Sequence, residues 1–148
     1  MLETSLSSQD FLFGLYLLLS LAFGYLIGAE RESRGKTAGI ATQCLVIAGS
    51  MAFCFFSTLM DPYSPSRIAA NVVTGIGFLG AGLIIFNPSG NRVMNLTTAA
   101  TVWMSAAIGM AIGFGYPIIA LALTVFTLIV VRIPHVSIPG PGRRGLQN

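Results

Sequence analysis

The chain alternates between long uncharged apolar segments and short polar ones. A segment of about 20 mostly apolar residues is long enough to cross the hydrocarbon core of a bilayer as a helix. Five such segments can be separated, at residues 11–29, 40–60, 68–86, 96–114 and 116–133. The pattern predicts an all-α protein, a polytopic membrane bundle of about five transmembrane helices that occupies residues 11–133.

The composition agrees with this pattern and excludes one large class. Hydrophobic residues make up 54% of the 148 residues and charged residues only 9%, whereas a soluble domain is usually about 25% charged. Eight basic and five acidic side chains are too few to cover a soluble domain of this size. A soluble enzyme is therefore excluded, and the lipid bilayer is the expected surroundings.

The distribution of Lys and Arg predicts an orientation. Of the eight Lys and Arg residues, only Arg67 lies in a segment that follows an even-numbered predicted helix. Cytoplasmic loops carry an excess of such residues, so residues 1–10 are expected outside and residues 134–148 inside, as a disordered cytoplasmic tail. The net charge of +3 is then an orientation signal, and it requires no nucleic acid partner.

Small residues recur at helical spacing in several of the predicted helices. Because small residues let helix backbones approach closely in lipid, we expect tight helix packing and a homo-oligomer. The residues expected to serve this packing are Gly24, Gly28, Gly75, Gly77, Gly80, Gly82, Ser105, Gly109 and Gly113.

Polar side chains enter the third and fourth predicted helices. Arg67 and Asn71 share one face of the third with Thr74, and Thr97 and Thr101 begin a hydroxyl-bearing ridge on the fourth. This face could line a pathway or dock a partner, or it could form structural hydrogen bonds between helices. No Asp or Glu lies deep in a predicted helix, which argues against a carboxylate-driven carrier.

A charged cluster closes the first predicted helix. Glu30, Arg31 and Glu32 stand there, and Arg92 from a later loop could reach Glu30. Carboxylates are ligands that Mg²⁺ prefers, but two carboxylates among several cations make a poor metal cage. We therefore expect local ion pairs and no cofactor, with Mg²⁺ as the one ion to consider. No Ser/His/Asp or Cys/His set for nucleophilic catalysis occurs, so we expect no enzyme.

Several ordered motifs resemble the membrane domain of the MgtC/SapB family over residues 11–133. The motifs are Gly28-Ala29-Glu30-Arg31, Ala38-Gly39-Ile40, Ser66-Arg67-Ile68-Ala69-Ala70, Gly75-Ile76-Gly77-Phe78-Leu79-Gly80-Ala81-Gly82 and Leu96-Thr97-Thr98-Ala99-Ala100-Thr101-Val102-Trp103. The resemblance implies a bacterial inner-membrane protein of about five helices. Its best-known members are linked to growth in low Mg²⁺ and to virulence, and are thought to act on other membrane proteins, notably the F-type ATP synthase.

The sequence also departs from the family pattern. Ala41 stands where the family commonly has Arg, Ser33 replaces an aromatic residue, Asn95 a Gly, and Thr97 an Asn of the virulence-associated members. Many members carry a C-terminal ACT-like domain, and we expect none here, because only residues 134–148 follow the predicted membrane part. If these positions contact a partner, the partner of this chain is expected to differ.

The leading hypothesis is a non-enzymatic regulator of Mg²⁺ and membrane-energy homeostasis that acts by contact with other membrane proteins. The alternative is a transporter or channel for a small ion such as Mg²⁺. The residues expected to carry either function are Glu30, Arg31, Arg67, Asn71, Arg92, Thr97, Thr98 and Thr101.

Overall fold

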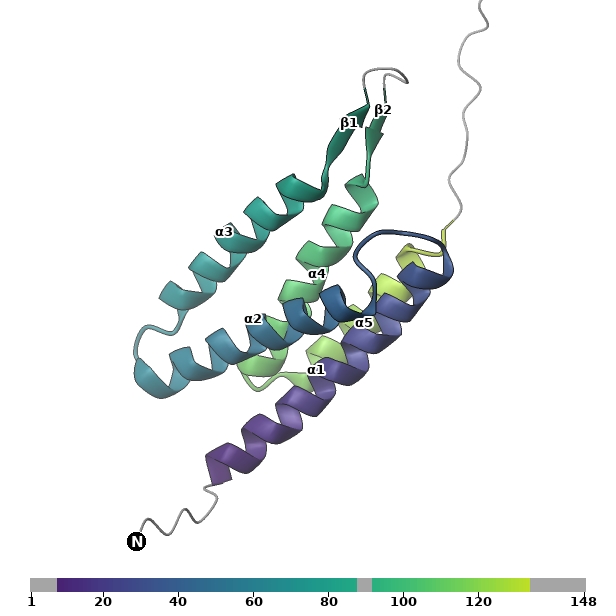
Figure 1. Ribbon diagram of the computed structural model, residues 1–148. Helices are drawn as coiled ribbons and strands as arrows, with labels where there is room; N and C mark the ends of the chain where they lie inside the picture. The colour runs from purple at the N-terminus through teal and green to yellow at the C-terminus, as the bar shows by residue number, and fades with distance from the viewer. Residues whose placement is uncertain (1–7, 88–91, 134–148) are drawn as a thin grey trace, which may run out of the picture.

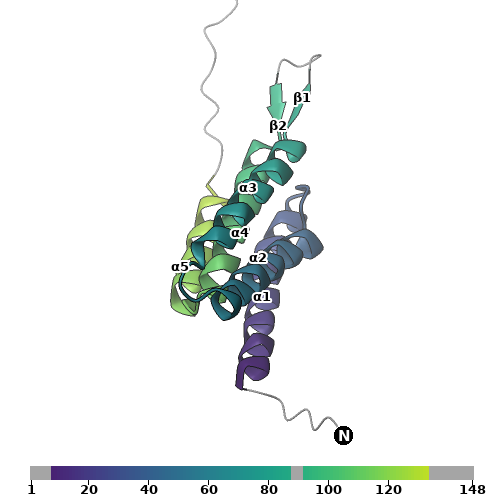
Figure 2. The ribbon, with the colours of Figure 1, turned by 90° about the vertical axis from the view of Figure 1, so that its left-hand side faces the viewer.

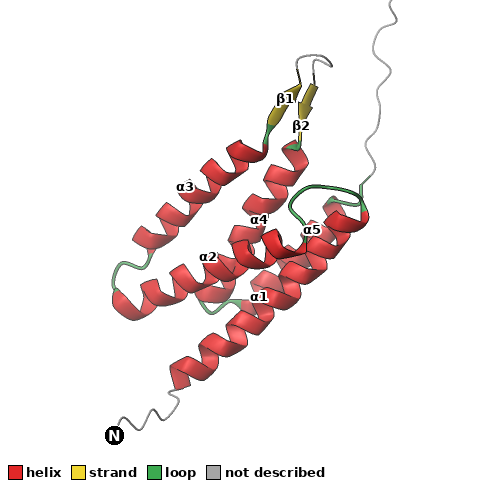
Figure 3. Ribbon diagram, in the orientation of Figure 1, coloured by secondary structure: helices red, strands yellow, loops and turns green. Residues whose placement is uncertain are grey.

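The computed structural model describes residues 8–87 and 92–133, so the predicted tail at residues 134–148 and most of the predicted outer N-terminus lie outside it. Within the described residues the chain forms five helices and two short strands (Figures 1 and 3). In chain order these are α1 Ser8–Ser33, α2 Ile40–Met60, α3 Ser66–Leu83, β1 Ile85–Asn87, β2 Arg92–Met94, α4 Leu96–Gly113 and α5 Pro117–Val130. The predicted all-α helix bundle is confirmed, with one small addition.

That addition is a β-hairpin where the third membrane segment was expected to continue to residue 86. Helix α3 ends at Leu83, and β1 pairs antiparallel with β2. The hairpin projects beyond the neighbouring ends of α3 and α4 (Figure 1). The sequence is consistent with the change, because Ile, Phe and Val, which occur in β1 and β2, favour strands.

The fifth predicted membrane segment is shorter than expected. Helices α1 to α4 are long and apolar enough to cross a membrane, whereas α5 has 14 residues in place of the span 116–133. Most of the difference lies at the C-terminal end, where α5 stops at Val130 and the N–H of Arg132 bonds to the carbonyl of Ile129 at 3.2 Å. At the other end, Gly115 follows α4 in a left-handed conformation (φ 84), and the N–H of Tyr116 bonds to the carbonyl of Ala111 at 2.8 Å. The residues just before Pro117 form this turn. Proline is well suited to the first position of a helix, so α5 begins there.

Helix α2 occupies the centre of the bundle. It packs against α1 on one side and α4 on the other, while α5 packs on α4 and α3 lies mainly against α4 (Figures 1 and 2). The core between these helices is apolar, and its buried members are Tyr16, Phe23, Ile27, Ile47, Met51, Phe55, Ile108, Ile112 and Ala120.

Helices α1 and α2 touch through their backbones. A Cβ atom built on Gly24 would lie 2.5 Å from the Cα atom of Cys44, and one built on Gly28 would collide with the backbone of Ile40. Non-bonded carbon atoms have their optimal separation at about 3.5–4.0 Å. The two glycines therefore set how closely α1 approaches α2.

Helices α2 and α4 touch in the same way. A Cβ atom on Gly109 would collide with the carbonyl oxygen of Ile47, and one on Gly113 with that of Met51. The small-residue ridge predicted on the fourth helix thus lies against α2.

The glycines of α3 are placed differently. No atom lies within 4 Å of a Cβ built on Gly75, Gly77 or Gly82, and one on Gly80 would meet Ala99 at an ordinary 3.9 Å. Among the described residues, Gly75, Gly77 and Gly82 therefore have no close neighbour, whereas Gly80 is buried against α4 together with Ala69 and Val72.

We predict that Gly109→Ala lowers the free energy of unfolding by about 1–3 kcal/mol, because the added methyl group forces α4 away from α2. The matched control is Gly14→Ala, since no atom lies within 4 Å of a Cβ at Gly14. Alanine also favours helix over glycine, so this control is expected to be neutral or slightly stabilising. Thermal unfolding in detergent, followed by circular dichroism, measures both, and equal destabilisation of the two variants would contradict the prediction.

Candidate functional site

Polar side chains gather where α1 ends and α2 and α4 begin. We call this region the basic end of the bundle, comprising residues 30–36 and the first turns of α2 and α4. Gly35 turns the chain there in a left-handed conformation (φ 62), and the N–H of Lys36 bonds to the carbonyl of Arg31 at 3.0 Å. The turn brings the start of α2 back beside the end of α1.

Arg31 connects α1 to α4. Its side chain is only 2% exposed, and its Nη2 donates a hydrogen bond of 2.8 Å to Oγ1 of Thr98, which is also buried. The structure thus brings together two residues that the sequence analysis had selected separately. A buried guanidinium held by a hydroxyl fixes the position of α4 relative to α1 at this end.

Glu30 stays on its own helix. Its buried carboxylate forms an ion pair with Nε of Arg34, one turn further along, at 2.5 Å. Its Oε2 atom makes no hydrogen bond in the described part of the chain. The side chain of Arg92, which was expected to reach Glu30, is outside what the structure describes. Glu30 and Arg31 are therefore neighbours in sequence with different partners.

Glu32 stabilises the start of α2. Its Oε1 accepts a hydrogen bond of 2.9 Å from the backbone N–H of Ile40, so a carboxylate lies at the positive end of a helix dipole. A Cβ atom at Gly39 would collide with this carboxylate. In the described ranges, 8–87 and 92–133, no three His, Cys, Asp or Glu side chains come together as a metal site would require.

A buried amide that the sequence analysis did not select completes the basic end. Gln43 and Ser105 are both fully buried, and Ser105 donates a hydrogen bond of 2.6 Å to Oε1 of Gln43. Nε2 of Gln43 donates to the carbonyl of Ala38 at 3.1 Å, and Ala38 has a left-handed backbone (φ 60). Gln43 could have been found as the long polar side chain within the apolar segment 40–60.

The remaining hydroxyl groups of α4 divide between its interior and its surface. Thr101 is buried and donates to the carbonyl of Thr97 at 2.7 Å, whereas the side chain of Thr97 is exposed. Asn95, which precedes the helix, is left-handed (φ 63). Asparagine tolerates that conformation better than most residues, which explains how it can stand where the family pattern has glycine.

Arg67 and Asn71 lie at the start of α3, and many residues of the chain separate them from the basic end. Both are exposed, and Nδ2 of Asn71 donates to the carbonyl of Arg67 at 3.2 Å. Thr74 bonds similarly to the carbonyl of Ala70. A transporter or channel would be favoured by a pathway between this polar strip and the hydroxyl ridge of α4. Ser105, Gly109 and Gly113 of that ridge lie against α2 instead.

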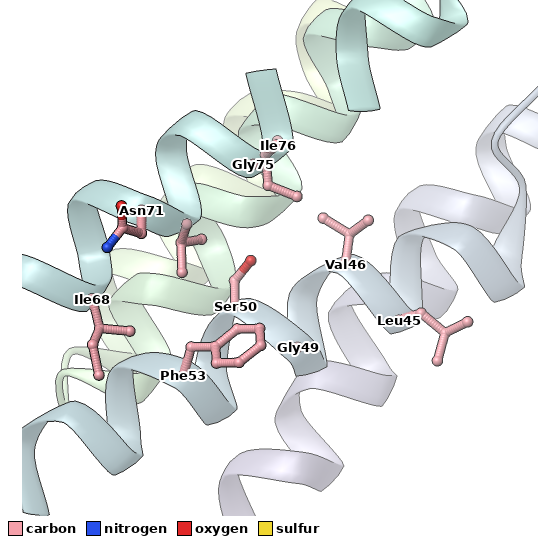
Figure 4. A pocket seen from close by; sticks show the side chains of 10 residues that line it. Leu45, Val46, Gly49, Ser50, Phe53, Ile68, Asn71, Gly75 and Ile76 are labelled. Atoms are coloured by element: carbon pink, nitrogen blue, oxygen red, sulfur yellow. The ribbon is translucent and has the colours of Figure 1, made fainter. Parts of the chain in front are cut away.

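A groove runs between α2 and α3. Its volume is about 490 Å³, and Asn71 from α3 and Ser50 and Phe53 from α2 line it (Figure 4). Apart from Asn71 and Ser50, its lining residues are apolar or glycine. Asn71 therefore lies beside an apolar surface and is not part of a polar channel.

Comparison with known proteins identifies relatives over most of the chain. The profile of the MgtC family matches residues 17–136. Protein MgtC of Salmonella typhimurium (strain LT2) is 48% identical over 114 residues, which are 77% of this chain and 48% of that protein. Protein MgtC of Brucella abortus (strain 2308) is 47% identical over 108 residues, 72% of this chain and 44% of that protein.

The chain spans about half the length of these curated relatives. No solved structure gives a significant match.

We predict that Thr98→Val lowers the free energy of unfolding by about 1.5–3 kcal/mol, because it removes the acceptor of a buried charged donor with almost no change of shape. Thr97→Val is the matched control, since that neighbouring side chain is exposed, and we expect it to change stability by less than about 0.5 kcal/mol. Thermal unfolding of both purified variants checks this. A Thr98→Val protein as stable as the control would show that the hydrogen bond to Arg31 is unimportant.

Proposed function

The chain is a multi-pass membrane protein of the MgtC family, and from that premise we propose that it is a non-enzymatic regulator that acts by helix contact with other membrane proteins. The process proposed is Mg²⁺ and membrane-energy homeostasis, and the membrane is a bacterial inner membrane with the basic end on the cytoplasmic side. The partners proposed are a second copy of the chain and, as the family resemblance implies, a subunit of the F-type ATP synthase.

The observation that carries this proposal is the exposed surface of α3, which includes its side of the groove in Figure 4. One continuous side of that helix is exposed and, apart from Arg67 and Phe78, is made of small or short polar residues. We call it the small-residue face of α3, and its members are Ala70, Asn71, Thr74, Gly75, Gly77, Ala81 and Gly82. Phe78, 85% exposed, projects from the middle of this face.

Such a face suits another helix better than it suits lipid. Small residues let backbones approach closely, and that close packing drives association where lipid removes the hydrophobic effect between helices. Helix α5 offers the contrast, because Ile118, Phe126 and Ile129 are bulky, apolar and at least half exposed, as a lipid-facing surface should be. These two exposed surfaces, of α3 and of α5, thus differ in the neighbour that each fits.

The charged residues support a role without a cofactor. The carboxylate of Glu30 is in an ion pair with Arg34, and that of Glu32 caps α2. Both acidic groups of the basic end therefore already have protein partners.

The departures from the family pattern bear on the choice of partner. Ala41 and Thr97 are both exposed at the basic end. A protein that contacts this end therefore meets a short apolar side chain, where the family pattern commonly has Arg, and a hydroxyl, where the virulence-associated members have Asn. We propose that the α3 contact is shared with those members and that the contact at the basic end is specific to this chain.

We predict that the double variant Gly75→Leu/Gly82→Leu reduces cross-linking between copies, or co-purification of the F-type ATP synthase, by about fivefold or more. That is the loss expected when about 1 kcal/mol of contact energy is removed. Neither glycine has an atom within 4 Å of its Cβ position, so the first carbon of each added side chain meets no clash within the chain. Circular dichroism of the variant checks that the fold is retained. Ala122→Leu, on the exposed side of α5, is the matched small-to-large control.

Two results would contradict the proposal. One is that the cross-linking yield and the co-purification yield of the double glycine variant both match those of Ala122→Leu. The other is rapid ion flux in liposomes reconstituted with the pure protein that disappears on Asn71→Leu, since this would indicate a transporter or channel.

A further inference from the structure

A second cavity, separate from the groove in Figure 4, opens at the basic end. It lies between the end of α1, the start of α4 and the end of α5, and its volume is about 720 Å³. Binding sites for small molecules typically measure about 300–1,000 Å³. The cavity is therefore large enough for a phosphate group together with the organic part to which it is esterified.

One wall of this cavity is positively charged. Arg31, Arg34 and Lys36 line it, and its lining residues include no Asp or Glu. Glu30 offsets part of the charge of Arg34, to which it is paired. Arg31 is 2% exposed, and its Nε makes no hydrogen bond in the part of the chain that is described. A buried guanidinium with an unused donor is poised for an anion.

The start of α4 adds to this wall. Leu96, Thr97 and Thr98 form its first turn and line the cavity, and the preceding Asn95 makes no side-chain cap. The first N–H groups of a helix have no partner within the helix, and the helix dipole is positive there. Helix starts of this kind bind phosphate groups.

The opposite wall is apolar. Val130, Val131 and Ile133 from the end of α5 line it. A ligand that fits both walls carries a negative charge at one end and an uncharged organic part at the other. An isolated inorganic ion would use only half of the cavity.

We propose that this cavity binds the phosphate group of a phosphate ester, supplied by a phospholipid headgroup or by a free phosphate compound. Arg31, held in place by Thr98, and the first turn of α4 contact the phosphate oxygens. Lys36 closes the exposed side, where its flexible ammonium group can follow the ligand. This binding site does not depend on the α3 contact proposed above.

Native mass spectrometry of the full chain in detergent tests this assignment with three probes: phosphatidylglycerol, phosphatidylcholine and inorganic phosphate. We expect phosphatidylglycerol to bind the native protein more tightly than phosphatidylcholine does. Lys36→Gln should weaken it about fivefold, the effect of one basic residue near an anionic headgroup. Lys36→Arg should restore binding, and Arg67→Gln, which removes the same charge from an exposed site on α3, should have no effect.

Inorganic phosphate distinguishes the two sources. If it raises the melting temperature of the native protein but not of Lys36→Gln, while phosphatidylglycerol binds both proteins alike, the ligand is a free phosphate compound. The proposal is overturned if no probe depends on Lys36, or if Arg67→Gln weakens binding as much as Lys36→Gln. Circular dichroism of each variant confirms that the exposed substitutions leave the fold intact.

Discussion

The structure depends on direct backbone contact between α2 and its two neighbours. Gly24 and Gly28 bring α1 against α2, and Gly109 and Gly113 bring α4 against its opposite side, at distances that leave no room for a methyl group. In a bilayer the hydrophobic effect does not hold helices together, so close packing has to do so. These four positions therefore fix the three-helix unit on which α3, α5 and the connecting turns are placed.

The polar interior follows from that contact. With no water among the helices, a buried polar group has to find its partner within the protein. Gln43 and Ser105 meet across the α2–α4 contact, and Arg31 and Thr98 meet where α1 ends beside α4. Helix α3 takes no part in these contacts. Its Asn71 and Thr74 bond to the backbone of their own helix, which leaves one of its sides available to another molecule.

The pattern of apolar residues was sufficient to predict the helices. A helix that crosses a bilayer needs a minimum length of apolar sequence, and such segments can be read directly from the chain. It failed where local backbone chemistry decides, at the hairpin after Leu83 and at the turn after Val130 that ends α5 before residue 133. The spacing of the small residues predicted which of them share a helix face, but not which helix each face contacts. The glycines of the third and fourth segments were therefore expected to pack equally closely. Gln43 was missed because its importance depends on Ser105, 62 residues away.

The short α5 has a consequence for the surrounding bilayer. Its 14 residues extend about 21 Å along the helix axis, whereas a hydrocarbon core is about 30 Å thick. Acyl chains beside this bulky apolar surface must shorten or tilt to match it, at a cost of fractions of a kcal/mol for each ångström of mismatch. The bundle therefore has one thin edge, and lipids with shorter or more disordered chains should collect along it in preference to those of a thick, ordered membrane.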